Sequence, residues 1–100
     1  MITVDIKFML YLESAPELTM GKKTVRMELD DGSTFGDLLE GLSGAFGSGL
    51  AGEIYDPATR SPREMVRAII NGVLAHNFDG TDTVLRHGDT VIFVPLVMGG

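Results

Sequence analysis

The stretch Thr90-Val91-Ile92-Phe93-Val94-Pro95-Leu96 has the pattern of a β-strand and stands directly before Val97-Met98-Gly99-Gly100. β-branched and aromatic residues dominate this stretch, and they favour extended backbone. A matching pattern lies near the start of the sequence, where apolar residues hold every second position: Ile2, Val4, Ile6, Phe8 and Leu10. Alternation of this kind predicts a strand with one buried face. We therefore predict strands over residues 2–12 and 90–96.

The segment that follows the first strand predicts another strand and a helix. Residues 22–29 alternate again, and residues 30–32 supply the Asp and Gly of a turn. Ser33 or Thr34 can then cap a helix, with Asp37 in the favourable first turn. The apolar stripe of this helix is Phe35, Leu38, Leu39, Leu42 and Phe46.

The later segments differ in how clearly they predict structure. Residues 66–71 have a strand pattern, and Asn71-Gly72 is the strongest dipeptide signal for a two-residue hairpin turn, here leading into Val73-Leu74. Residues 47–65 have no periodicity and predict a long loop, in which Ile54-Tyr55 could add a short strand. Residues 81–85 fit a short helical turn or a connector.

The composition sets the broad class of protein. One hundred residues with 44% apolar content fit one compact domain, which we place at residues 1–96, followed by a flexible tail over residues 97–100. The absence of cysteine excludes disulfides and thiolate metal sites and suits a cytoplasmic protein. The net charge of −6 disfavours nucleic-acid binding and favours an electropositive protein partner. No run is long and apolar enough to span a membrane.

The order of the predicted elements indicates an α+β fold. Two strands, a helix, a strand, a short strand and a last strand make a mixed sheet of four to five strands with one main helix packed on one face. The preference for right-handed crossovers leaves few alternatives to the β-grasp, or ubiquitin-like, fold, in which the first and last strands are neighbours.

The pair Gly99-Gly100 favours chemical access over packing. Glycine has no side chain to pack, and it loses more backbone entropy on folding than any other residue. A narrow channel that admits an extended tail excludes a Cβ, so two glycines allow a terminal carboxylate to reach a partner's site. Fully extended, the segment from Val97 to Gly100 spans roughly 13 Å. The alternatives are a frayed terminus or a cloning remnant.

Three segments carry a resemblance to the ubiquitin-like sulfur carriers: Ile69-Ile70-Asn71-Gly72-Val73, Leu85-Arg86-His87-Gly88-Asp89-Thr90-Val91-Ile92-Phe93-Val94-Pro95 and Gly99-Gly100. Their order and spacing resemble the small subunit of molybdopterin synthase, the thiamine sulfur carrier and the ubiquitin-related modifier of transfer-RNA thiolation. The sequence departs from the molybdopterin branch at Leu96-Val97-Met98, which is bulkier than the Pro-Val-Ala common there. It also has the longer segment 47–65.

The resemblance implies that Gly100 is the reactive residue and that Gly99 gives the tail access. A ubiquitin-activating-like adenylyltransferase would use ATP to form an acyl adenylate at Gly100, which a persulfide donor would convert to a thiocarboxylate. A large synthase subunit or another acceptor enzyme would then take the sulfur, with molybdopterin synthesis as the expected pathway. The chain itself would bind no cofactor and would not be catalytic alone.

The expected docking surface is the exposed sheet face near the last strand. Its candidate contacts are Phe93, Pro95, Leu96, Val97 and Met98. For Phe93, packing in the core is at least as good an explanation, because alternate strand residues are usually buried.

The other polar residues do not form a catalytic or metal-binding pattern. His76 and His87 lack further ligands at regular spacing and are expected to be ordinary surface residues. Asp79, Asp82 and Asp89 lack the spacing of a calcium loop. The glycine-rich residues 47–52 lack the Lys-Ser/Thr of a phosphate loop. We therefore expect no metal site.

Three functions are open from the sequence. The first is a sulfur carrier that acts through a thiocarboxylate on Gly100. The second is a covalent modifier that joins Gly100 to target lysines, and the few lysines of the chain itself, Lys7, Lys22 and Lys23, weakly disfavour polymers of it. The third is a noncovalent β-grasp interaction domain, which alone would survive replacement of Gly100.

Overall fold

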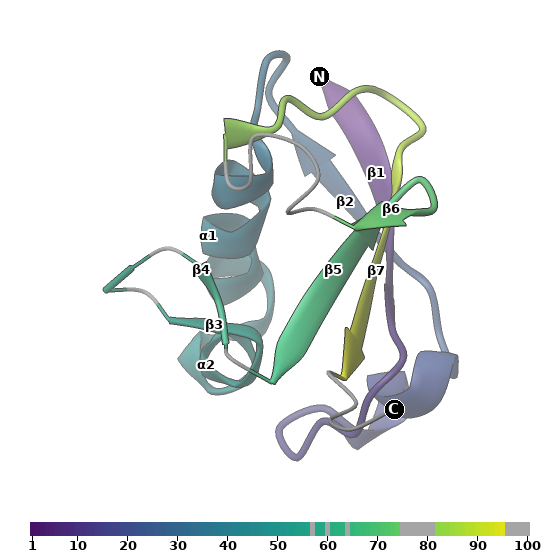
Figure 1. Cartoon of the computed structure of the whole chain (residues 1–100), viewed down its shortest axis with the longest axis vertical. Coiled ribbons are helices and arrows are strands. Elements are labelled where there is room, and N and C mark those ends of the chain that lie inside the picture. Colours follow the sequence, from purple (N-terminus) through teal and green to yellow (C-terminus); the bar gives the residue numbers. More distant parts are fainter. Residues whose placement is uncertain (57, 60, 64, 75–81, 96–100) are drawn as a thin grey trace.

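The computed structural model describes residues 1–56, 58–59, 61–63, 65–74 and 82–95. It contains a five-stranded sheet of order β2-β1-β7-β5-β6 with the main helix, α1, on one face (Figure 1). These elements are β1 at Ile2–Phe8, β2 at Val25–Leu29, α1 at Phe35–Phe46, β5 at Val66–Ile70, β6 at Val73–Leu74 and β7 at Thr90–Pro95. The predicted α+β, β-grasp fold is confirmed.

The first and last strands of the sheet lie side by side and run parallel (Figure 1). In this pair Ile6 is opposite Val91 and Phe8 is opposite Phe93. β2 pairs antiparallel with β1, and β5 pairs antiparallel with β7. β7 is therefore the middle strand. β1 is shorter than predicted, because after Met9, whose N–H still donates to the Phe93 carbonyl, the chain leaves the sheet.

Helix α1 begins at Phe35 because Thr34 and Asp37 form a capping box. The Thr34 hydroxyl accepts from the Asp37 N–H at 3.2 Å, and the Asp37 carboxylate accepts from the Thr34 N–H at 2.9 Å. Thr34 is thus the cap, whereas the Ser33 carbonyl accepts from Leu85 N–H and holds the connector before β7. Most of the predicted apolar stripe is buried, but Phe46 is 37% exposed.

An aromatic stack lies between the helix and the sheet. The ring centroids of Phe8 and Phe93 are 5.5 Å apart with an interplanar angle of 12°, and those of Phe35 and Phe93 are 6.1 Å apart. All three rings are essentially inaccessible to solvent. The stack therefore joins β1, β7 and α1 in one core.

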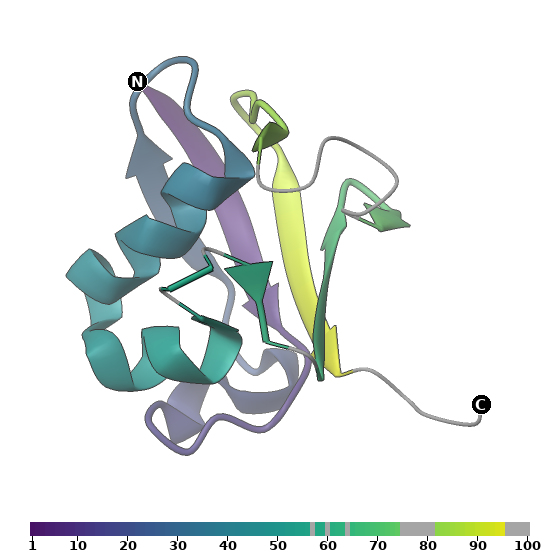
Figure 2. The same ribbon diagram turned by 60° about the vertical axis from the view of Figure 1, so that its left-hand side comes forward.

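The long loop predicted over residues 47–65 is wrong for much of its length. This segment contains helix α2 at Ser48–Ile54 and a small hairpin of β3 at Tyr55–Asp56 and β4 at Ser61–Pro62, on the same side of the sheet as α1 (Figure 2). Gly49 and Gly52 have low helix propensity, so local sequence does not predict this helix. Burial of Leu50, Ala51 and Ile54 against the core stabilises it. The short strand expected at Ile54-Tyr55 is confirmed as β3, one residue later.

The hairpin between β5 and β6 is confirmed. Asn71 and Gly72 have φ values of 51° and 86°, the left-handed pair that a two-residue turn of this kind requires. The 3₁₀ element η1, Pro16–Gly21, lies between β1 and β2. Within the described residues, no helix is long and apolar enough to cross a bilayer.

Candidate functional site

β7 leads directly to the residues that the sequence singles out for chemistry. Pro95, its last residue, pairs with Val66 and is exposed. The remaining candidates for the reactive tail and its docking, Leu96, Val97, Met98, Gly99 and Gly100, lie outside the described residues. What the structure does describe is the strand that carries them and the surface beside it.

The two faces of β7 differ sharply in burial. Val91 and Phe93 point into the core with no solvent exposure, whereas Ile92 and Val94 on the other face are only half-buried. The partner contact expected of Phe93 is therefore corrected: the core packing weighed against it is what the structure has. Counting the alternation outward from Phe93 would have identified Ile92 and Val94 instead.

The face of the sheet away from α1 has an apolar half next to Pro95. Ile92 of β7 is opposite Ile69 of β5. Val94 is the next residue of β7 on the same face, and it directly precedes Pro95. All three aliphatic side chains are half-buried. We call Ile69, Ile92 and Val94, which lie next to Pro95, the apolar patch.

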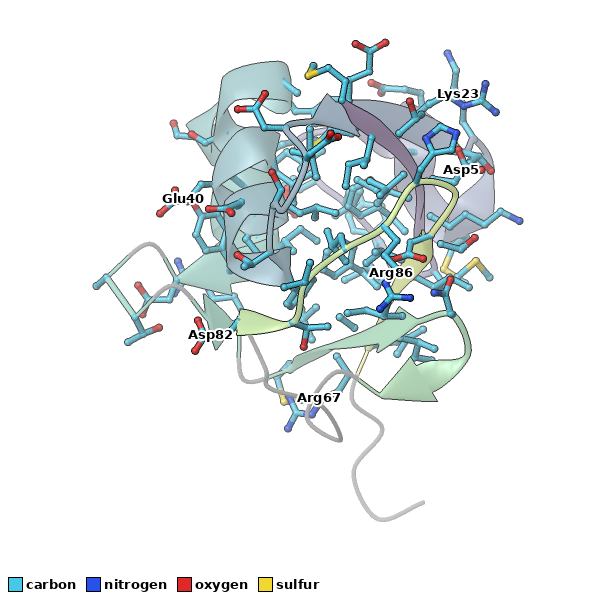
Figure 3. All side chains as sticks on the ribbon, turned by 90° about the horizontal axis from the view of Figure 1, so that it is seen from above. Asp5, Lys23, Glu40, Arg67, Asp82 and Arg86 are labelled. Carbon is cyan, nitrogen blue, oxygen red and sulfur yellow. The ribbon has the colours of Figure 1, made fainter. Side chains whose placement is uncertain are left out.

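Two basic residues are in register with residues of the apolar patch. Lys7 of β1 is opposite Ile92, and Arg67 of β5 is opposite Val94. Arg67 lies at the β5 end of the sheet, far from Lys23 next to β2 (Figure 3). Although the chain carries a net charge of −6, the rim of the patch favours acidic groups on a partner.

The other half of this face is polar. Thr3, Asp5, Arg26, Glu28, His87 and Gly88 line a hollow of about 410 Å³ there. The Nδ1 atom of exposed His87 accepts a hydrogen bond from the Thr3 N–H at 3.1 Å. His87 thus extends the β1–β7 pairing, and His76 lies outside the described residues.

A polar cluster fixes the start of β7. The Asn71 side chain donates to the Asp89 carboxylate at 2.9 Å and accepts from the Thr90 N–H at 2.9 Å. The other Asp89 oxygen accepts from the Arg86 N–H at 2.8 Å. The residues that carried the family resemblance therefore hold β7 in register, a role that spacing alone did not reveal.

Glu53 of α2 fastens the chain between β1 and η1. Its carboxylate accepts from the Glu13 and Ser14 N–H groups at 2.8 and 2.9 Å. Burial raises the pKa of Glu53, but hydrogen bonds from Ser14 and Glu13 outweigh it, and the net pKa lies below the ordinary value. Glu53 is not among the residues predicted from the sequence, because its helix was not predicted.

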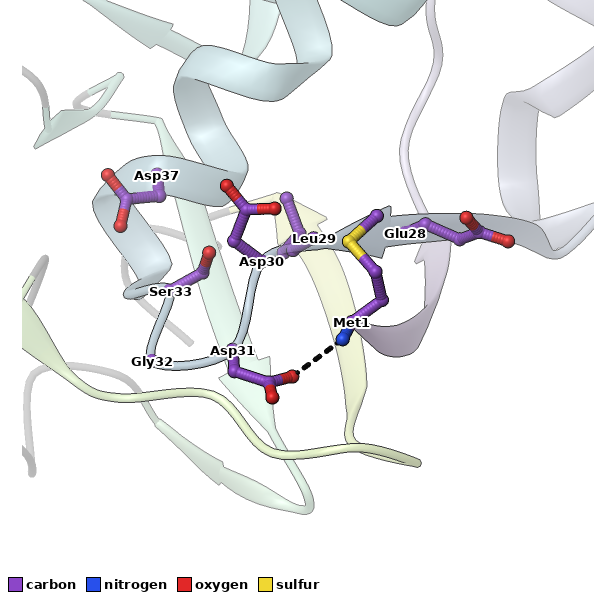
Figure 4. A pocket seen from close by; sticks show the side chains of 8 residues that line it. All are labelled: Met1, Glu28, Leu29, Asp30, Asp31, Gly32, Ser33 and Asp37. Atoms are coloured by element: carbon purple, nitrogen blue, oxygen red, sulfur yellow. Dashed lines mark ion pairs between the residues drawn. The ribbon is translucent and has the colours of Figure 1, made fainter.

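A second hollow lies at the opposite end of the sheet from Pro95. Its volume is about 490 Å³, and its lining includes Met1 and the acidic residues Glu28, Asp30, Asp31 and Asp37 (Figure 4). The N-terminal amine lies 2.9 Å from Asp31, whose pKa is lowered by the hydrogen bond and by the positive charge. Among the described residues, no group of three or more His, Cys, Asp and Glu side chains could hold a metal ion.

Comparison with known proteins identifies the family. The ThiS family matches this sequence over residues 9–100. The chain belongs to the ThiS family. This family agrees with the resemblance to the ubiquitin-like sulfur carriers noted in the sequence.

Archaeal proteins are among the relatives of this ThiS-family chain. Small archaeal modifier protein 3 of Haloferax volcanii is 35% identical over 81 residues, which cover 81% of this chain and 85% of the relative. The solution structure of the Haloferax volcanii HVO 2177 protein has a TM-score of 0.73 at 28% identity, covering 99% of this chain and 87% of that one. SAMP1 from the same organism has a TM-score of 0.66 at 25% identity, covering 98% and 99%.

Proposed function

We propose that this ThiS-family protein is a sulfur carrier that is activated at the carboxylate of Gly100. The observation that carries the proposal is the anchoring of β7, the middle strand, whose Phe93 is locked in the aromatic stack while Pro95 emerges beside the apolar patch. A rigid body of this kind presents the following residues at a fixed place and so raises their effective concentration at a docked enzyme.

The proposed chemistry takes place on partners. A ubiquitin-activating-like adenylyltransferase binds ATP, the Gly100 carboxylate attacks the α-phosphate, and pyrophosphate leaves. A persulfide sulfur then attacks the acyl carbon and AMP leaves; a thiol on the donor side cleaves the resulting acyl disulfide, which forms a disulfide and releases the thiocarboxylate. The described part of this chain supplies docking and orientation. The recipient that the sequence favours is a pterin precursor held by a large synthase subunit.

A covalent modifier is the second candidate function, and a specific observation favours it. The relative at 35% identity is named a small archaeal modifier protein. A modifier would use the same acyl adenylate, but a lysine amine would displace AMP and form an isopeptide bond. The two functions therefore share Gly100 and the docking surface and differ only in the nucleophile.

The test is the intact mass of the protein after incubation with ATP, the activating enzyme and a persulfide donor. Replacement of one oxygen by sulfur is expected in the native chain and not in a chain that lacks Gly100. A Gly99→Val variant should react much more slowly, because a β-branched residue does not fit a narrow channel. A lysine-linked adduct would instead support the modifier. An unchanged mass with an enzyme proven active would refute both and leave the noncovalent domain.

A further inference from the structure

β2 forms one edge of the sheet, and its backbone has a defined set of outward-facing groups. In β1 the N–H groups of Thr3 and Asp5 point toward the β7 side, where they donate to His87 and Asp89. Because the backbone groups of successive strand residues point to opposite edges, the even residues of β1 face β2. Their partners in β2 include Met27, which is opposite Val4. The N–H and C=O groups of Arg26 and Glu28 therefore face away from the sheet.

The charges along this edge follow a simple order. Basic residues come first and acidic residues last: Lys22, Lys23 and Arg26, then Glu28, Asp30 and Asp31. All six are exposed. The chain has only eight Lys and Arg residues, so three of its eight cations lie within five positions of one strand edge. Such a concentration of basic residues is not expected in an acidic protein whose charges are dispersed.

We propose that two copies of this chain pair through their β2 edges in antiparallel orientation about a two-fold axis at Met27. Antiparallel pairing brings the basic start of each β2 against the acidic end of the other. In this register Arg26 of one copy is opposite Glu28 of the second copy, twice over by symmetry, and Lys23 comes opposite Asp31. The outward backbone groups of Arg26 and Glu28 form the hydrogen bonds between the two sheets.

The charges select this register over its neighbours. A shift by two residues places Arg26 opposite Arg26, or Glu28 opposite Glu28, and like charges directly opposite are destabilising. A shift by one residue would pair side chains that point toward α1 with side chains on the face away from α1. A two-fold axis normal to the sheet does not allow this, because it keeps each face on its own side. The centre at Met27 is therefore the favoured pairing.

The side of α1 that lies over the β2 edge carries two glycines, Gly41 and Gly44. A Cβ on Gly41 would lie 3.3 Å from the Met27 sulfur, so Gly41 faces β2, and Gly44 follows one turn later with nothing within 4 Å of its Cβ position. No side chain projects from either position over the edge. A second sheet can therefore approach β2 without meeting bulky groups from these two residues.

The contact that Arg26 makes within its own copy is compatible with the pairing. Arg26 contacts Asp5 through Nε at 3.2 Å, and its side chain is 74% exposed. Its terminal guanidinium nitrogens provide further donors for Glu28 of the second copy. β1 separates β2 from β7, so the dimer leaves the apolar patch and Pro95 uncovered. The inference does not depend on the proposed function.

Sedimentation velocity over a concentration series at low ionic strength tests the dimer. We expect weak self-association, with Kd on the order of 10⁻⁴ M, because edge pairing buries less surface than a standard interface. Added salt should weaken it, since the pairing charges are exposed. Arg26→Glu and Glu28→Arg should each raise Kd by about tenfold or more, because each change turns both symmetric pairs repulsive.

The decisive arm mixes the two variants. Arg26→Glu has acids at both positions and Glu28→Arg has bases at both, so an equimolar mixture should recover the association of the native chain. Circular dichroism of each variant checks that it is folded. In the native chain, amide exchange at Arg26 and Glu28 should slow as concentration rises, which needs no variant. A native chain that stays monomeric, or a mixture no tighter than its components with unchanged exchange at these amides, would overturn the proposal.

Discussion

Phe93 and Ile92 are neighbours in the sequence, yet they lie in opposite environments. Phe93 is fully buried and stacks on Phe8 and Phe35, whereas Ile92 lies half-buried on the face away from α1. One face of β7 therefore fixes the strand in the core, and the other offers an apolar surface beside Pro95. A single strand can thus use one set of alternate residues for stability and the other set for recognition.

Truncation on the core face should have the largest effect. Phe93→Ala is expected to lower the free energy of unfolding by about 3–5 kcal/mol, since it removes the ring that joins β1, β7 and α1. Ile92→Ala is the matched control and should cost about 1 kcal/mol or less. Urea unfolding of both variants measures the difference. Equal losses would mean that the two faces do not differ in the way the burial indicates.

A polar substitution on the face of β7 away from α1 should impair recognition by the activating enzyme more than it lowers stability. Ile92→Ser is expected to lower kcat/KM of the activating enzyme for this substrate about tenfold, equivalent to about 1.4 kcal/mol. Its unfolding free energy should fall by no more than about 1 kcal/mol. Glu40→Gln on α1, on the covered side of the sheet, serves as the control and should react like the native chain. If both variants react normally, the apolar patch is not the docking surface.

Removing the Asn71 side chain, which reaches from the β5–β6 turn to the start of β7, should have a moderate effect on stability alone. Asn71→Gly keeps the positive φ of the turn but loses the hydrogen bonds to Asp89 and Thr90, which should cost about 1 kcal/mol. Asn71→Ala loses the same bonds and adds left-handed strain, so it should be less stable than Asn71→Gly. Thermal unfolding of the pair separates the two terms. The reverse order of stability would refute the turn geometry.

The smallest effect is expected from the carboxylate that fastens the chain after β1. Because the pKa of Glu53 is lowered in the folded state, its stabilisation is present above the ordinary pKa and is lost as pH falls through that value toward the lowered one. Glu53→Gln should therefore reduce stability near neutral pH and flatten its dependence on acid. Unfolding midpoints of native and variant chains between pH 3 and 7, roughly the carboxyl range, provide the measurement. Parallel curves would contradict the assignment.

Local sequence patterns predicted most of the sheet correctly. They did not predict helix α2, where contacts with the core outweigh a low helix propensity. The alternation in β1, the Asn71-Gly72 turn and the capping residues all act over a few positions, so the sequence displays them directly. Helix α2 has two glycines among seven residues and is stabilised by contacts of Leu50 and Ile54 with the core. No window of local sequence contains those contacts, and the helix was therefore predicted as loop.

The candidate site divides along the same line. Periodicity, turn residues and motif order are local properties, so the sequence alone was enough to predict the strands of the main sheet and α1 in their order, the strand before Gly99-Gly100 and the family of the chain. The packing of the whole chain was needed to establish which face of β7 is buried, that Asn71 and Asp89 fasten β7, and that Arg26 and Glu28 face an open edge. These facts depend on which strands pair with each other. Strand pairing is determined by the packing of the whole core and not by any local stretch of sequence.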